Sequence, residues 1–360
     1  MGGRVGLKGT DGKEILARAR DLGAKPVSPV RTIEALREIT QIADSIELVT
    51  YPFDMGEEEA RECGFDPKVL GSIKENETTA ADTANAAMAM LKCHVDLILF
   101  AGGDGTARDV CRSVRQDVPA LGIPTGVKIH SAVFAVNPRK AGELTVRFLH
   151  GKASLREAEV MDTDEQAFRE GRLSAHLCGY LKVPYEKDAV QPSKSASFAT
   201  LDEETSQDSI AQCIVERMED SCYYILCPGT TVKAVADKLG VAKTLLGVDL
   251  IHKRTLVGSD LNEQGLLKLL GQKKAKIIVS PIGRQGFIFG RGNPQISPAV
   301  IRRVGRENIL IIATPSKLLS IGPGGPLLVD TGNEETDRML SGYVRVVTGY
   351  QEEVVVKVSS

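Results

Sequence analysis

Residues 95–107 read Val-Asp-Leu-Ile-Leu-Phe-Ala-Gly-Gly-Asp-Gly-Thr-Ala, an apolar run that passes directly into a glycine-rich turn. The run at 95–100 predicts a buried strand, and residues 107–114 after the turn predict a helix. Such a turn suits phosphate, because glycines let the backbone approach an anion and the helix N-terminus offers free N–H groups. The stretch therefore predicts an α/β fold with a phosphate site at the turn.

Asp104 is unexpected in this turn, because its negative charge would repel a phosphate group. Its presence indicates a divalent metal ion or a proton to be taken from a hydroxyl group, and both belong to phosphoryl transfer. We expect Asp104 to be the catalytic residue. The residues expected to bind phosphate around it are Gly102, Gly103, Gly105 and Thr106. The alternative is a plain strand-to-helix connection in which Asp104 only caps the helix.

The composition excludes several classes of protein. Lys and Arg total 45 against 47 for Asp and Glu, and aromatic residues make up 4% of the 360 residues with no Trp. Neither a basic excess nor a stacking surface is present, so no nucleic-acid partner is expected. No apolar stretch has the length of a signal peptide or a membrane span, which predicts a cytoplasmic protein without a membrane partner.

Cysteine and histidine spacing gives no metal signature. The seven cysteines are scattered without a C-x-x-C pair, and the five histidines show neither H-x-x-x-H nor H-E-x-x-H. Free, mostly buried thiols in a reducing compartment are the expectation, and no protein zinc site is predicted.

Strand and helix signals alternate in the first third of the chain. Helices are predicted at 29–43 and 80–91, the latter with Thr79 and Asp82 as a capping box, and strands at 46–50, 95–100 and 120–123. This alternation indicates an open, mainly parallel sheet, in which ligands bind at the carboxyl ends of the strands. Residues 1–125 are therefore predicted to form a Rossmann-like nucleotide- and phosphate-binding domain.

The pattern changes after Pro124. The alternating stretches 173–177 and 180–183 are typical of antiparallel strands with one solvated face. Further segments are predicted as helices at 202–219 and 232–239, and as strands at 223–227, 276–280, 309–313 and 327–330, with two more strands in 342–360. We expect residues 126–310 to form a β-rich α+β substrate-binding domain, and residues 311–360 to return to the N-terminal domain.

Several further residues are candidates for binding phosphate. Pro228-Gly229-Thr230-Thr231 is a second strand–turn–helix, whose hydroxyls would contact phosphate or cap the helix. The remaining candidates lie in turns or near the N-terminus: Arg4, Lys8, Thr125, Lys128, Arg291 and Asn293. His130 is interpreted as a partly buried structural histidine.

The glycine turn resembles the signature of the NAD kinase, diacylglycerol kinase and phosphofructokinase superfamily. Three other stretches are similar to the ATP-NAD kinase/AcoX-like branch: 122–128 (Gly-Ile-Pro-Thr-Gly-Val-Lys), 228–231 (Pro-Gly-Thr-Thr) and 290–293 (Gly-Arg-Gly-Asn). The resemblance implies an α/β N-terminal domain, a β-rich C-terminal domain and a substrate site between them. It also implies a homodimer or homotetramer.

The activity implied by the resemblance is transfer of a phosphoryl group from ATP, with Mg²⁺, to the 2′-hydroxyl of the adenosine ribose of NAD. Asp104 would then act as the base or orient that hydroxyl. The donor could equally be polyphosphate, since both need similar anion sites.

Two features depart from the pattern of this branch. The chain begins as if the usual first strand, with its Asn-Pro turn, were missing. The Asn-Glu pair that grips the acceptor has no clear equivalent, although Asp162, Asp164 and Glu165 lie in roughly that region. Two alternatives therefore stay open: a kinase of the same fold with another small-molecule or lipid-like hydroxyl acceptor, and a non-catalytic nucleotide-binding AcoX-like protein.

Overall fold

The computed structural model describes residues 2–7, 13–75, 77–126, 129–163, 175–186, 189–191, 201–322 and 324–360. The chain forms two compact units. The first, here called the motif unit, comprises Pro26–Phe168 and Arg172–Lys194. The second, called the large-sheet unit, comprises Met1–Lys25, Arg169–Gly171 and Ser195–Ser360. The predicted mixed α/β class, with parallel strands followed by a strand-rich part, is confirmed.

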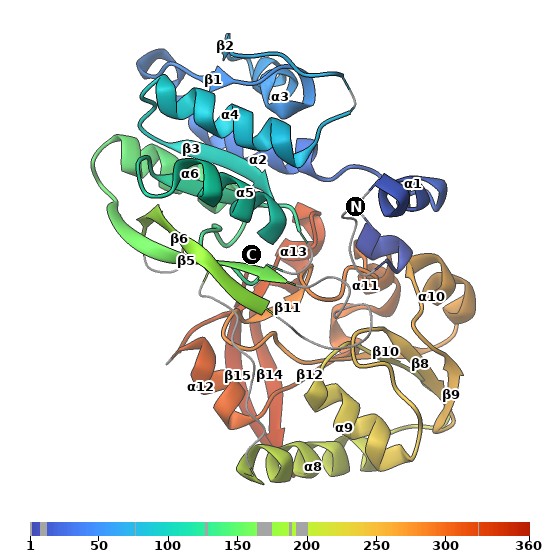
Figure 1. Cartoon of the computed structure of the whole chain (residues 1–360). Coiled ribbons are helices and arrows are strands. Elements are labelled where there is room, and N and C mark those ends of the chain that lie inside the picture. Colours follow the sequence, from blue (N-terminus) through green and yellow to red (C-terminus); the bar gives the residue numbers. More distant parts are fainter. Residues whose placement is uncertain are drawn as a thin grey trace. The chain divides into compact units, whose positions relative to one another are not determined.

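The motif unit contains three two-stranded sheets with helices around them (Figure 1). Strands β1 and β2 are parallel, as are β3 and β4, whereas β5 and β6 form an antiparallel hairpin. Its elements are α2 (Ser28–Ile39), η2 (Thr40–Ser45), β1 (Val49–Thr50), η3 (Phe53–Met55), α3 (Glu57–Glu62), β2 (Lys68–Val69), α4 (Ala80–Lys92), β3 (Ile98–Gly102), α5 (Asp104–Val114), β4 (Ala120–Pro124), α6 (Pro138–Leu149), β5 (Ser154–Thr163) and β6 (Ala175–Tyr185).

The core of the motif unit is a hydrophobic cluster that includes residues of α5, β3 and β4. Helix α5 buries Ala107, Val110, Cys111 and Val114, the spacing that places side chains on one helical face. On β4, a side chain at Gly122 would lie 2.3 Å from the ring of Phe134, so only glycine fits there. This packing fixes the strand–turn–helix that carries Asp104.

Local predictions in the motif unit hold to different degrees. The capping box between Thr79 and Asp82 at the start of α4 is confirmed. Only Val49–Thr50 of the segment predicted at 46–50 form a strand, and the helix predicted at 29–43 changes to a 3₁₀ turn after Ile39. Of the alternating residues 173–183, those that the structure describes, 175–183, belong to one long strand, β6, rather than two.

The large-sheet unit is built on a nine-stranded mixed sheet with the order β11-β13-β15-β14-β12-β10-β7-β8-β9. Its elements are η1 (Gly2–Val5), α1 (Lys13–Asp21), α8 (Leu201–Glu216), β7 (Tyr223–Leu226), α9 (Thr230–Leu239), β8 (Asp249–His252), β9 (Thr255–Gly258), α10 (Glu263–Leu270), β10 (Ala275–Val279), β11 (Phe287–Phe289), α11 (Pro298–Val304), η4 (Arg306–Asn308), β12 (Ile309–Ile312), α12 (Pro315–Ile321), β13 (Leu327–Val329), α13 (Glu334–Leu340), β14 (Gly342–Gly349) and β15 (Glu352–Ser359).

The predicted return of residues 311–360 to the N-terminal domain is wrong. Strand β14 pairs in parallel with β12, and β15 lies between β14 and β13. Val346 and Val358 are almost completely buried in the core of this sheet, which explains why the segment stays there. The units therefore do not follow the predicted boundaries at residues 125 and 310.

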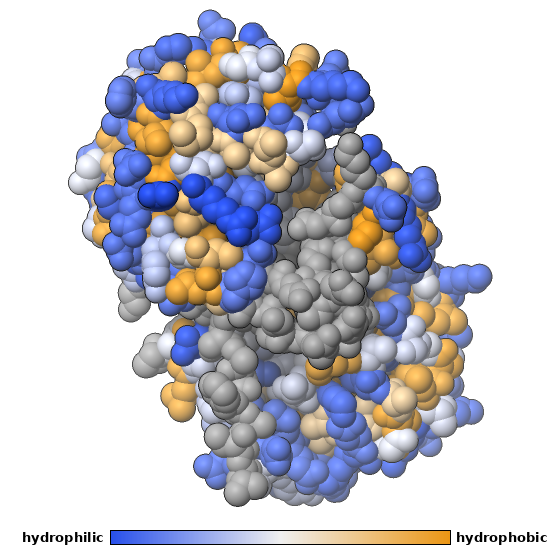
Figure 2. All heavy atoms as spheres, in the orientation of Figure 1, coloured by the Kyte–Doolittle hydropathy of each residue, from blue (hydrophilic) through white to orange (hydrophobic). Residues whose placement is uncertain are grey.

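The cysteines and the surface give two further observations. All seven cysteines are free thiols, and Cys111, Cys213, Cys222 and Cys227 are buried. On the face drawn in Figure 2, hydrophilic and apolar residues are intermixed. Among the described residues, no helix has both the length and the apolar character needed to cross a bilayer.

Candidate functional site

The glycine turn joins β3 directly to α5. Strand β3 ends at Gly102, Gly103 is extended with φ −127° and ψ −162°, and α5 begins at Asp104. The first hydrogen bond of the helix runs from the Ala107 N–H to the Gly103 carbonyl at 3.0 Å. The N–H groups of residues 104–106 therefore precede the helical ladder and are the natural donors to an anion.

The turn that follows β4 packs against the glycine turn. The Gly102 carbonyl accepts hydrogen bonds from the N–H groups of Thr125 at 3.0 Å and Gly126 at 3.2 Å. A side chain at Gly102 would lie 2.3 Å from Oγ1 of Thr106, and one at Gly126 would lie 3.3 Å from Cα of Gly103. The structure thus brings Thr125 beside the motif and leaves no room for a side chain at Gly102.

The Asp104 carboxylate is buried, and both of its oxygens have partners within the protein. Oδ2 accepts the His130 N–H at 2.8 Å and lies 3.3 Å from His130 Nδ1. Oδ1 accepts the Ser131 N–H at 2.9 Å and the Ser131 hydroxyl at 2.6 Å. Four partners match the roughly four lone-pair positions of a carboxylate. These donors offset the negative charge, and they occupy the positions at which either oxygen would accept a hydrogen bond from a substrate hydroxyl.

His130 contacts Asp104 directly, whereas the sequence predicted only a partly buried structural histidine. Its side chain is 2% exposed, and Nε2 is buried without a hydrogen-bond partner in the part of the chain that the structure describes. A carboxylate only accepts hydrogen bonds, so Asp104 favours the tautomer with the proton on Nδ1. Nε2 then carries a free lone pair. The sequence holds one sign of this role: His130 follows the predicted strand at 120–123, and this strand, β4, pairs with β3.

Arg108 lies one helical turn after Asp104. Its Nη1 donates to Asp162 Oδ2 at 2.7 Å and its Nε donates to Asp109 Oδ1 at 3.0 Å. The hydrogen bond to Asp162, together with the Asp109 carboxylate, raises the pKa of the Arg108 guanidinium despite its partial burial. Asp162, a candidate for gripping the acceptor, is therefore already ion-paired.

Helix α2 supplies a cation that sequence reasoning missed. Arg31 is 7% exposed, and its Nε lies 3.4 Å from the Pro124 carbonyl while Nη1 contacts Glu34 at 3.3 Å. The Ser28 hydroxyl on the same helix donates to Thr125 Oγ1 at 3.3 Å. A basic and a hydroxyl side chain thus flank the turn beside the motif. The predicted residues Lys8, Lys128, Asp164 and Glu165 lie outside the described residues.

In the large-sheet unit, the turn at 228–231 leads into α9. Gly229 is the N-cap with φ 122° and no side chain caps the helix, so neither threonine has the capping role that was considered. Thr230 is exposed, whereas Thr231 is buried and accepts a hydrogen bond from Lys317 Nζ at 2.8 Å.

Lys317 links the carboxyl ends of neighbouring strands. Its Nζ also donates to Ser280 Oγ at 3.1 Å. Strands β7, β10 and β12 are parallel neighbours, so the residues that follow them meet at one edge of the sheet. This edge therefore carries one ammonium group among hydroxyls, a second arrangement suited to anions.

Glu203 of α8 accepts hydrogen bonds from residues that follow β12, at the same edge of the sheet. The Thr314 hydroxyl donates to Glu203 Oε1 at 2.9 Å, and the Ser316 hydroxyl donates to Oε2. Burial acts to raise the pKa of Glu203, but the hydrogen bonds from Ser316 and Thr314 outweigh it and lower this pKa below 4.5.

The predicted residues near 291 have contacts within the protein. Arg291 is 3% exposed, lies 3.6 Å from Asp330 Oδ2 and stacks 4.7 Å above the Phe287 ring. The Asn293 amide donates to the Ile288 carbonyl at 2.8 Å. These interactions stabilise the turn. Arg4 is exposed in η1.

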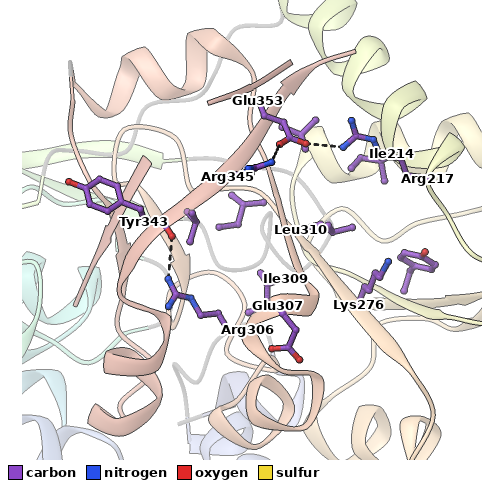
Figure 3. A pocket seen from close by; sticks show the side chains of 14 residues that line it. Ile214, Arg217, Lys276, Arg306, Glu307, Ile309, Leu310, Tyr343, Arg345 and Glu353 are labelled. Carbon is purple, nitrogen blue, oxygen red and sulfur yellow. Dashed lines mark hydrogen bonds and ion pairs between the residues drawn. The ribbon is translucent and has the colours of Figure 1, made fainter. Parts of the chain in front are cut away.

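A pocket of about 750 Å³ lies in the large-sheet unit (Figure 3). Arg217 and Arg345 both point to Glu353, at 2.9 and 3.7 Å, and Arg306 donates to the Tyr343 carbonyl. None of the predicted site residues lines it. Its arginines are thus engaged with protein groups. The better candidate site is the group of Asp104, His130 and Ser131, here called the Asp104 cluster.

Comparison with known families gives two matches. The model described as the ATP-NAD kinase N-terminal domain matches residues 24–153, which include the Asp104 cluster. The model described as the ATP-NAD kinase C-terminal domain matches residues 219–358, which include the turn at 228–231. No curated protein and no solved structure matches the chain.

Proposed function

The chain belongs to the ATP-NAD kinase family, and from this premise we propose that it transfers the terminal phosphoryl group of ATP to the 2′-hydroxyl of the adenosine ribose of NAD, giving NADP. The observation that carries the proposal is the strand–turn–helix at Gly102–Thr106. Its helix N-terminus and its close glycine contacts fit a phosphate group.

Phosphoryl transfer asks mainly for positioning and for stabilisation of charge. The first-turn N–H groups of α5 would hold phosphate oxygens, and Arg31 beside Pro124 would add positive charge. The two carboxylates of α5, Asp104 and Asp109, have protein partners. Mg²⁺ would therefore be held chiefly by the nucleotide phosphates and water, and would neutralise their charge.

Asp104 and His130 are proposed to have different roles in the reaction. We assign Asp104 the role of a positioning residue, because its oxygens are filled by His130 and Ser131. His130 Nε2, which lacks a partner within the described residues, would take the proton of the acceptor hydroxyl. As the hydroxyl oxygen bonds to the terminal phosphorus, the bond from phosphorus to the ADP oxygen breaks. The proton then passes from His130 to solvent.

The direct test is incubation of the purified chain with ATP, Mg²⁺ and NAD, followed by measurement of NADP. Loss of a general base costs about 10²–10⁴-fold, so His130→Gln should lower kcat by that factor. Asp104→Asn should lower it comparably, because an amide can hold the wrong tautomer. His94→Gln, an exposed histidine, is the matched control. Absence of NADP from a folded wild type would refute the proposal.

One observation favours a second candidate, a kinase of the same fold with another hydroxyl acceptor. Asp162, in the region expected to grip the acceptor, is engaged by Arg108 at 2.7 Å. Recognition of the NAD riboses therefore has no residue assigned to it. Release of ADP measured across a panel of hydroxyl compounds separates the two candidates: stimulation by NAD alone excludes the second.

A further inference from the structure

The β5–β6 hairpin of the motif unit carries three metal-binding side chains on one face. Asp162 of β5 pairs directly with His176 of β6, so their side chains lie on the same side of the hairpin. Cys178 is two residues beyond His176, and its sulfur lies near both of these side chains. It is also the extra residue of a bulge, since Met161 pairs with Leu177 and Val160 pairs with Gly179.

We propose that Asp162, His176 and Cys178 bind a transition metal ion of the Zn²⁺ type. A carboxylate oxygen, an imidazole nitrogen and the thiol sulfur lie within 4.8 Å of one another. A mixed set of nitrogen, oxygen and sulfur donors suits Zn²⁺ or Co²⁺, whereas Mg²⁺ and Ca²⁺ prefer oxygen alone. Three protein ligands leave a fourth tetrahedral position for water or another ligand.

The surroundings hold the carboxylate in place. Arg108 donates to Oδ2 of Asp162 at 2.7 Å, and a carboxylate keeps further lone pairs with which to bind an ion. Hydrogen-bonded partners of this kind orient the carboxylate ligands of metal sites. The preceding residue is also fixed, because the Met161 N–H donates to Ser131 Oγ at 2.9 Å while the Ser131 hydroxyl donates to the Met161 carbonyl at 3.1 Å.

The site is open to solvent. His176 is exposed, and Asp162 and Cys178 are half-buried, so an ion has a path of entry. The sequence predicted no zinc site, because the spacing of its histidines and cysteines matches no zinc motif. Asp162 comes beside His176 only through the pairing of β5 with β6. The proposal does not depend on the proposed kinase activity.

The experiment is a titration of the metal-stripped full chain, free of any histidine tag, with Co²⁺. Binding should reach one ion per chain, with the absorption of a cobalt–thiolate bond, and Zn²⁺ should displace it. Cys178→Ser should abolish this absorption. His176→Ala, an exposed position, should weaken Co²⁺ binding by at least about tenfold, the smallest loss that even outer partners of a metal cause.

Cys93→Ser and His94→Ala are the matched controls, since both residues are exposed on the same unit and lie outside the trio. They should leave the absorption and the affinity unchanged. Circular dichroism establishes that each variant is folded. The proposal is overturned if the wild type shows no cobalt–thiolate absorption at saturating Co²⁺, if Cys178→Ser retains it, or if Cys93→Ser loses it.

Discussion

At the scale of single residues, neighbouring glycines of the motif have different roles. At Gly102 an added side chain would meet Thr106, with Oγ1 at 2.3 Å and Cβ at 2.5 Å. At Gly103 the nearest atom to an added Cβ is 3.8 Å away, and the backbone angles suit any residue. Gly102 is therefore required by packing of the turn, whereas a Cβ at Gly103 would make an ordinary van der Waals contact with Gly126.

Gly102→Ala should thus be destabilising and Gly103→Ala should be tolerated. Overpacking of this kind costs about 1–3 kcal/mol, while Gly103→Ala should change the free energy of unfolding by roughly 0.5 kcal/mol or less. Urea unfolding monitored by circular dichroism measures both. Equal stability of the two variants would contradict the contact with Thr106.

The Asp104 cluster illustrates what a sequence reveals at this scale. The proposed phosphate-binding role of Gly102–Thr106 was predictable from local order, since strand, turn and helix are contiguous. The partners of Asp104 do not, because His130 and Ser131 lie 26 and 27 residues away. Only the packing of β4 against β3 brings them together.

At the scale of elements, Glu203 joins α8 to the start of α12. The side chain is 6% exposed and accepts hydrogen bonds from the hydroxyls of Thr314 and Ser316. Because these bonds favour the ionised form, the pKa of Glu203 is lower in the folded chain than the ordinary 4.5. The stabilisation is fully present above pH 4.5 and is lost as pH falls through the lower, folded pKa.

Glu203→Gln should therefore destabilise the chain at pH 7 by about 1.5–3 kcal/mol, the usual contribution of hydrogen bonds to a charged group. The difference from wild type should shrink as the pH drops below 4.5. Urea unfolding across this pH range tests it, with exposed Glu204→Gln as the control. A difference that stays constant with pH would exclude the assigned role.

Elements with strong local signals were predicted well from the sequence. The helix α4 with its capping box, the turn before α9 and the strand pair β14–β15 all lie close to their predicted positions. The placement of β15 between β14 and β13 was not predictable. Apolar alternation marks a strand, but it does not specify which distant strand becomes its neighbour.

At the scale of the whole molecule, each hydrophobic cluster draws its residues from one unit. Among the described residues, two clusters lie in the motif unit, around Phe134 and Ile39, and two lie in the large-sheet unit, around Phe289 and Tyr224. Units with their own cores are expected to have separate stabilities.

Calorimetry should therefore show two unfolding transitions that respond to different substitutions. Phe134→Ala, at 0% exposure, should cost about 3–5 kcal/mol and lower only the motif-unit transition. Val358→Asn buries an amide without a partner, which costs roughly 2–7 kcal/mol. It should lower only the transition of the large-sheet unit. Exposed Lys357→Asn is the control for β15. A single transition lowered by both substitutions would contradict two independent cores.

The position of β15 has a consequence for how the protein is made. Residues 352–359 lie between β14 and β13, so the sheet is incomplete until they have been synthesised. Residues 26–168 and 172–194 can complete their unit long before that, because domains fold as units during translation. Nascent chains halted before residue 352 would therefore contain a folded motif unit. Their strands β13 and β14 would still have exposed edges, to which a chaperone would bind.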